Sequence, residues 1–141
     1  MDIRPLTDGY AVSPQIAAED AAAIAAEGFK TVICNRPDGE VPTEFQADAI
    51  RAAVEAAGMS FVENPVVGGA ITPENVSGQA AVISGQSGPV LAYCASGNRS
   101  SIVWAMAQAG VRPLEELIAT PARYGYNLEP FRPVLEQLSK G

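Results

Sequence analysis

The apolar residues of the chain fall into short runs that alternate with alanine-rich or polar stretches. Four runs predict β-strands because they are short, rich in β-branched or aromatic residues and bounded by turn residues. The stretches between and after them have the composition of helices. The predicted strands cover residues 9–12, 30–34, 60–64 and 89–93, and the predicted helices cover 17–27, 43–57, 73 onward, 99–109, 113–119 and 128–139.

Several residues mark where these helices begin and end. Ser13 followed by Pro14 predicts a helix start, because a serine cap followed by proline at the first position is a common combination. Thr72 and Pro73 repeat the same signal, and Gly58 ends the second predicted helix.

Strands separated by helices predict a single α/β domain over residues 1–141, with three layers around a mostly parallel sheet. Sites in such sheets form at the carboxyl ends of the strands. We therefore expect the loops at 35–42, 65–71 and 94–99 to meet at one edge.

Composition narrows the classes of function. The net charge of −7 opposes binding to nucleic acids and anionic membrane surfaces. No leader or membrane-spanning segment is evident, so a cytoplasmic protein is expected. The chain contains no histidine, which excludes Ser-His-Asp and Cys-His catalysis and ordinary histidine-ligated metal sites. We expect no metal and no cofactor.

The turn Cys94-Ala-Ser-Gly-Asn-Arg99 carries the candidate chemistry. Gly97 permits a tight turn in which backbone N–H groups and the following helix N-terminus hold an anion. The same groups stabilise a thiolate on Cys94, and Arg99 adds a permanent cation suited to an oxyanion. The alternative is an inert buried cysteine at the end of a strand.

Further residues complete the predicted site. Ser100 and Ser101 are expected to donate hydrogen bonds to the thiolate or its adduct. Asp38, Arg36 and Cys34 are possible auxiliary residues. The predicted anion-binding loop consists of Ala95, Ser96, Gly97, Asn98 and Ser100.

The spacing of the two key residues separates two thiolate chemistries. Cysteine phosphatases resemble C-x-x-x-x-x-R, whereas rhodanese-like sulfurtransferases resemble C-R-x-G-x-R, which matches the shorter spacing from Cys94 to Arg99. A phosphatase also needs a general acid, and the loop 65–71 has no carboxylate. Asp38 or Glu40 would have to serve instead, although the sequence around Asp38 is also typical of a simple turn.

The whole chain resembles the DUF442 family, the phosphatase-like domain of β-lactamase hydrolase-like proteins. The resemblance implies a fold like that of dual-specificity phosphatases, with Cys94 as nucleophile and Gly97 and Arg99 as its cradle. Some members are fused to a persulfide dioxygenase, which implies sulfide or persulfide metabolism and such an enzyme as partner. Others have been regarded as phosphatases. The segments that carry the resemblance are 28–40, 69–74, 88–100 and 126–128.

The chain departs from the usual family loop, Cys-Arg-Ser-Gly-Thr-Arg, at Ala95 and Asn98. The missing arginine removes a cation, and Arg36 on the adjacent predicted loop is a candidate to replace it. Cys34 either resolves an oxidised Cys94 or is a core residue. Three aromatic residues either line a substrate groove or simply pack: Tyr124, Tyr126 and Phe131.

These observations favour a sulfurtransferase that carries a persulfide on Cys94 and moves sulfur from a small sulfane donor to a thiol acceptor. The first alternative is a phosphatase that acts on a phosphorylated substrate through a phosphocysteine. The second is a non-catalytic oxyanion-binding module, which the departure at Ala95 motivates.

Overall fold

A five-stranded sheet in the order β1-β2-β5-β3-β4 forms the centre of the protein. The computed structural model describes residues 2–85 and 88–140. The strands are β1 (Arg4–Thr7), β2 (Tyr10–Ser13), β3 (Thr31–Cys34), β4 (Ser60–Glu63) and β5 (Val90–Tyr93). The α-helices are α1 (Ala21–Ala26), α2 (Ala47–Ala56), α3 (Pro73–Gly85), α4 (Asn98–Ala107), α5 (Leu114–Ala122) and α6 (Arg132–Lys140).

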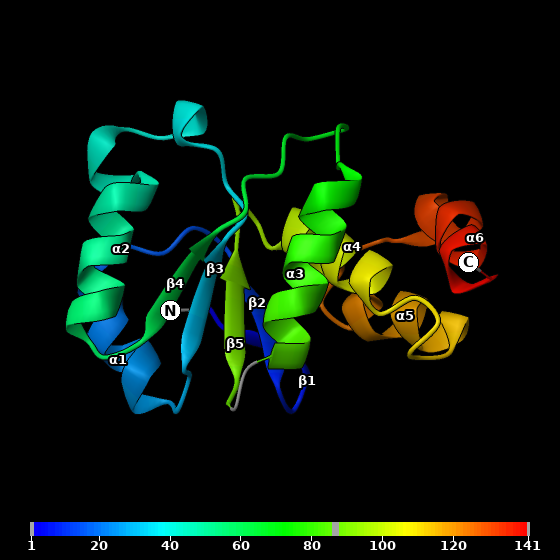
Figure 1. Ribbon diagram of the computed structural model, residues 1–141, viewed down its shortest axis with the longest axis horizontal. Helices are drawn as coiled ribbons and strands as arrows, with labels where there is room; N and C mark the ends of the chain where they lie inside the picture. Colours follow the sequence, from blue (N-terminus) through cyan, green and yellow to red (C-terminus); the bar gives the residue numbers. More distant parts are fainter. Residues whose placement is uncertain (1, 86–87, 141) are drawn as a thin grey trace.

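The strand β5 lies between β2 and β3 and runs parallel to both (Figure 1). Its last residue, Tyr93, pairs with Ser13 on one side and with Cys34 on the other. Because β4 also runs parallel to β3, the four carboxyl ends point to the same edge. The chain after each of these strands therefore begins beside the chain after its neighbours.

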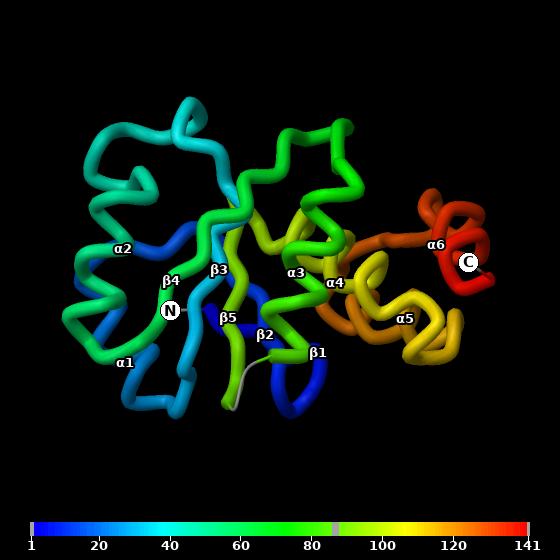
Figure 2. Tube along the Cα trace, in the orientation of Figure 1, coloured from blue at the N-terminus to red at the C-terminus, as the bar shows by residue number. Residues whose placement is uncertain are grey.

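Helices cover both faces of the sheet, which confirms the predicted three-layer α/β fold (Figure 1). Alternate residues of β5 face opposite sides, as the pleat of a strand requires. Leu91 packs in a cluster with Ile50 of α2, whereas Ala92 packs in a second cluster with Trp104 of α4. The helices α1 and α2 lie over the first face, and α3 and α4 lie over the second, with α5 and α6 beyond them (Figure 2).

Two features of the N-terminal part differ from the prediction. The edge strand β1 was not predicted, because four residues that include Pro5 have no apolar alternation. The helix start at Ser13 and Pro14 is wrong: Ser13 ends β2 and its hydroxyl donates to the Pro14 carbonyl. Pairing with β5 keeps Ser13 extended, and α1 begins only at Ala21.

In the described ranges 2–85 and 88–140, no helix has both the length and the apolar character to cross a bilayer.

Candidate active site

Cys94 lies directly after the central strand β5, at the start of a tight turn that leads into α4. Gly97 adopts a φ of +99°, a left-handed conformation that glycine tolerates best. This conformation turns the Gly97 N–H back toward Cys94, where it donates to Sγ at 3.1 Å. The turn thus supplies a backbone donor to the sulfur at the N-terminus of a ten-residue helix.

The turn also leaves donors available for an anion. Among the described residues, the backbone N–H groups of Ala95 and Ser96 have no hydrogen-bond acceptor. The N–H of Asn98, in contrast, donates to the Ser96 hydroxyl at 3.2 Å. Two backbone amides next to Cys94 are therefore free to bind an oxyanion.

Arg99 is held in one orientation by three of its five N–H donors. Nη1 donates to Glu40 Oε2 and to the Val66 carbonyl, and Nη2 donates to Glu40 Oε1, each at 2.8 Å. The two remaining donors, Nε–H and the second proton of Nη2, make no hydrogen bond to an oxygen or nitrogen of the described residues. Proximity to Cys94 adds to the raised pKa of Arg99, after the larger effect of the Glu40 hydrogen bonds. Arg99 can therefore hold an oxyanion beside the sulfur while its other edge stays on Glu40.

Glu40 is the carboxylate that pairs with Arg99. Its bidentate pair with Arg99 and its contact with Arg36 at 3.2 Å lower the pKa of Glu40 below its usual value. A carboxylate held ionised in this way positions an arginine well and is a poor proton donor.

Tyr126, from the segment after α5, packs against the Cys94 turn and forms a hydrogen bond with it. Its hydroxyl donates to the Ser96 carbonyl at 2.7 Å and accepts a hydrogen bond from Arg4 at 2.6 Å. A Cβ atom at Gly97 would clash with this hydroxyl, because the two atoms would be closer than any van der Waals contact allows. Gly97 is thus required by two independent constraints, its backbone conformation and the position of Tyr126.

With this geometry established, the chain can be compared with known proteins. Residues 2–111 match the family described as the phosphatase-like domain of beta-lactamase hydrolase-like protein. The chain belongs to this family. A beta-lactamase hydrolase-like protein from Xylella fastidiosa (strain Temecula1) is 30% identical over 130 residues, and one from Agrobacterium fabrum is 34% identical over 96 residues. The matches cover 91% and 68% of the chain but only 30% and 22% of these longer relatives.

Solved structures place this family member among proteins with phosphatase-like folds. A Neisseria meningitidis protein described as a "putative phosphatase" is 36% identical, with a TM-score of 0.84 over 98% of this chain and 99% of the other. A Shewanella putrefaciens member of DUF442 has a TM-score of 0.77 at 20% identity, over 98% and 91%. PTPMT1, solved in complex with PI(5)P, has a TM-score of 0.79 at 16% identity, over 98% and 94%. These last two likenesses concern the fold alone.

The structure brings the three predicted loops together. Arg99 of the Cys94 loop contacts Glu40 of the loop after β3 and Val66 of the loop after β4. The expectation that they share one edge is confirmed. In the anion loop, Gly97 has its predicted role, Ala95 and Ser96 offer their amides, and Asn98 opens α4.

The prediction for the serine hydroxyls is wrong. Ser100 is fully buried and donates its hydroxyl to Asn35 Oδ1 at 2.9 Å, while Ser101 donates to the Gly97 carbonyl at 2.8 Å. A hydroxyl has one proton to donate, so neither is available to the Cys94 thiolate.

Ser100 instead belongs to a buried amide network beneath the loop. Asn35 donates to Gln79 Oε1 at 3.0 Å, and Gln79 donates to the Tyr10 hydroxyl at 2.7 Å. Tyr10 in turn donates to the Ser100 carbonyl at 2.9 Å. Asn64 joins the network by donating to Gln79. The network connects β2, β3, the loop after β4, α3 and α4. The signal for it in the sequence is weak: Asn35 follows one predicted strand, and Asn64 is the last residue of another.

Of the two carboxylates that the sequence offers, Asp38 and Glu40, only Glu40 contacts Arg99. Asp38 Oδ1 accepts the backbone N–H of Ala47 at 2.8 Å, which satisfies a free donor at the start of α2. Its side chain is committed to this helix, and Glu40, two residues later, contacts Arg99 instead. Arg36 contacts Glu40 and Gln15, so its charge acts on the loop through Glu40.

Cys34 lies in the hydrophobic cluster beneath α1 and α2, and its thiol donates to the Arg36 carbonyl at 3.3 Å. Burial raises the pKa of Cys34, which disfavours the thiolate needed to resolve an oxidised Cys94. Both cysteines are free thiols. These observations favour the interpretation of Cys34 as a core residue.

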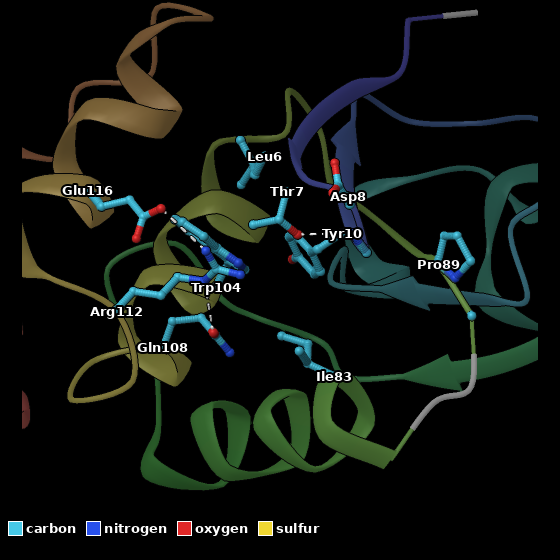
Figure 3. Close-up of a pocket in the computed structure, with 12 residues that line it drawn as sticks. Leu6, Thr7, Asp8, Tyr10, Ile83, Pro89, Trp104, Gln108, Arg112 and Glu116 are labelled. Carbon is cyan, nitrogen blue, oxygen red and sulfur yellow. Dashed lines mark hydrogen bonds and ion pairs between the residues drawn. The ribbon is translucent and has the colours of Figure 1, made fainter.

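Two hollows in the surface are of a size that suits a small molecule. The larger, about 670 Å³, lies at the amino ends of β2 and β5 and is lined by Tyr10, Pro89 and Trp104 among others (Figure 3). Cys94 follows the opposite, carboxyl end of β5. In the larger hollow, Arg112 is already paired with Glu116 and Gln108. The smaller, about 410 Å³, adjoins Arg99. Within the described part of the chain, no cluster of three or more acidic or cysteine side chains could hold a metal ion.

Proposed function

We propose that this domain is a cysteine-dependent phosphatase that cleaves phosphate monoesters through a phosphocysteine on Cys94. One observation carries the proposal: the Cys94 sulfur accepts the Gly97 N–H, and Glu40 holds Arg99 in place at the other end of the same turn. A phosphatase-like fold and the 36% identical relative described as a "putative phosphatase" support it.

The proposed reaction uses two displacements at phosphorus. The Cys94 thiolate attacks phosphorus, and the bond to the ester oxygen breaks, with the electron pair leaving on that oxygen. Water then attacks the phosphocysteine, which releases inorganic phosphate and restores the thiolate. The amides of Ala95 and Ser96 and the open edge of Arg99 stabilise the charge on the non-bridging oxygens.

No protonated carboxyl group is available from Glu40 or the loop after β4 to protonate the leaving oxygen. Residues 64–72, the loop after β4, contain no carboxylate, and two arginines keep Glu40 ionised. We therefore propose that the substrates have oxygens that leave readily without a proton.

Sulfur transfer is the second candidate, because four residues separate Cys94 from Arg99 and such transfer needs no general acid. In this case Cys94 would take sulfane sulfur from a small donor and pass it to a thiol acceptor. A persulfide dioxygenase, acting on the resulting persulfide, would be its functional partner.

The test compares both chemistries in one set of proteins. Wild type, Cys94→Ser and Cys34→Ser are each incubated with 4-nitrophenyl phosphate, thiosulfate and glutathione persulfide. We expect phosphate release by wild type and Cys34→Ser, and a loss of roughly a thousandfold or more in Cys94→Ser. Sulfur transfer to a thiol without phosphate release would reject the phosphatase in favour of the second candidate. If Cys94→Ser binds phosphate as wild type does and neither reaction occurs, the domain is an oxyanion-binding module.

A further inference from the structure

An apolar groove extends from Arg99 along the outer side of α4. Its floor is α4, one wall is the glycine-containing loop before α3, and the other is the segment that leads into α6. We call it the Phe131 groove; it is lined by Gly68, Gly69, Ile71, Asn98, Arg99, Ile102, Met106, Phe131 and Val134.

The groove and the anion site share Asn98 and Arg99. An oxyanion held by the open edge of Arg99 would therefore have its ester substituent at the mouth of the groove. The volume of about 410 Å³ is within the range of small-molecule sites. The groove is thus continuous with the proposed phosphate site and large enough for the organic part of a small substrate.

The polarity of the residues that line the groove determines which organic groups can bind there. Arg99 is the one charged residue among the nine that line the groove, and Asn98 is the one with a neutral polar side chain. Peptide groups or further phosphates placed there would lose water and would find only Asn98 and Arg99 as polar side-chain partners. An uncharged aromatic ring, in contrast, gains from contact with side chains such as Phe131 and Met106.

The chemistry of the leaving group also favours an aryl substituent. A phenolate is a much weaker base than an alkoxide, so it departs more readily when no acid protonates it. Because the loop after β4 has no carboxylate, an aryl ester suits this site better than an alkyl ester.

We propose that the Phe131 groove binds the aryl group of small, uncharged aryl phosphates; this proposal rests on the phosphatase function proposed above. Part of the groove comes from outside the residues that match the family. Phe131 and Val134 lie beyond residue 111, where the family match ends. The C-terminal segment is therefore the element that sets the preference for the substrate.

The test uses 2-naphthyl phosphate and phenyl phosphate, whose leaving groups are of similar basicity but differ by one ring. In wild type, kcat/KM for the naphthyl ester is expected to exceed that for the phenyl ester by about tenfold, because the second ring is buried. N-acetyl-phosphotyrosine amide, which carries peptide groups on one ring, is expected to show no such gain. A naphthyl ester no better than the phenyl ester, or a phosphotyrosine amide that equals the naphthyl ester, would overturn the proposal.

Two variants of α6 provide a matched pair. Val134 lines the groove and is 39% exposed, whereas Leu138 is 40% exposed and lies outside it. Val134→Glu and Leu138→Glu add the same charge to the same helix, and melting temperatures check that both remain folded. We expect Val134→Glu to remove the naphthyl preference and Leu138→Glu to keep it. Equal effects of the two variants would overturn the proposal.

Binding to Cys94→Ser, measured by calorimetry, separates the groove from the reaction. Suppose that wild type cleaves neither ester but that Cys94→Ser binds 2-naphthyl phosphate about tenfold more tightly than phenyl phosphate. The phosphatase function then fails, and the groove remains an aryl subsite. If the two bind equally, the aryl subsite fails whether or not esters are cleaved.

Discussion

Gly97 combines three roles at one position of the loop. Its N–H donates to the Cys94 sulfur, its φ of +99° forms the turn, and its missing side chain leaves room for the Tyr126 hydroxyl. A single residue therefore connects Cys94 with the segment after α5. Any side chain at this position would disturb the sulfur and its support together.

Gly97→Ala is expected to destabilise the protein by about 2–4 kcal/mol, the sum of backbone strain and a steric clash. Gly125→Ala is the matched control, because Gly125 has a φ of +88° but open space around it. This control should cost only about 1–2 kcal/mol. Urea unfolding measures both. Equal losses would show that Tyr126 does not restrict the loop, whereas Tyr126→Phe should partly rescue Gly97→Ala.

Glu40→Gln is expected to lower kcat/KM for an aryl phosphate by about tenfold to a hundredfold, because Arg99 loses the carboxylate that orients it. Glu63→Gln breaks a pair with Arg51 that involves neither Arg99 nor the Cys94 turn, and should leave kcat/KM unchanged. Steady-state kinetics on both variants provide the test. An unchanged rate in Glu40→Gln would mean that the Val66 carbonyl alone suffices to position Arg99.

The same carboxylate makes a small contribution to stability that depends on pH. Arg99, and then Arg36, lower the pKa of Glu40, whose usual value is 4.5. The folded protein therefore binds this proton less readily than the unfolded chain. The contribution is complete above pH 4.5 and is lost as pH falls through the lowered pKa.

The Glu40 side chain is 35% exposed, so the contribution should stay below about 1 kcal/mol. We expect the difference in unfolding free energy between wild type and Glu40→Gln to be largest near neutral pH and to shrink in acid. Urea unfolding at a series of pH values measures it. A difference that does not change with pH would contradict the assignment of the ionised form.

Several elements meet in the amide network beneath the loop. Gln79 of α3 is completely buried and contacts Tyr10 of β2 as well as Asn35 and Asn64. Buried amides of this kind stabilise a fold only when their partners are present. The network therefore fixes the loops after β3 and β4 relative to α4, which begins at the Cys94 turn.

Gln79→Leu is expected to cost about 1–3 kcal/mol, because it removes partners from buried polar groups at similar volume. Ser84→Ala, at an exposed position of the same helix, should change the unfolding free energy little. Urea unfolding again gives the comparison. A neutral Gln79→Leu variant would show that the neighbouring amides rearrange to satisfy one another.

The elements differ in how well the sequence predicts them. The strands β3, β4 and β5 follow from short runs of apolar residues, and the Cys94 turn follows from its residue types. The edge strand β1 does not, because it is defined by pairing with β2 rather than by its own pattern. The sequence predicts that the loops of Arg99 and Glu40 share an edge, but not that these two side chains, 59 positions apart, pair with each other.

At the scale of the whole molecule, the proposed anion site lies in an acidic protein. The net charge is −7, yet the loop after β5 gathers free amides, a helix N-terminus and Arg99. The parallel strands make this possible, because they bring the loops that orient Arg99 to a single edge. An anion should therefore bind at this one loop. Because it binds only the folded protein, it should raise the free energy of unfolding of the whole domain.

Inorganic phosphate at about one hundred times its Kd is expected to raise the unfolding free energy by about 2.7 kcal/mol. For a chain of this size the melting temperature should rise by roughly 5–10 °C. Cys94→Ser should keep this shift, since the amides and the guanidinium remain. Arg99→Met, compared with its own phosphate-free melting temperature, should lose most of it, whereas Arg51→Met should not. A full phosphate shift in Arg99→Met would place the anion elsewhere on the molecule and remove the basis for Cys94 as the nucleophile toward a bound phosphate ester.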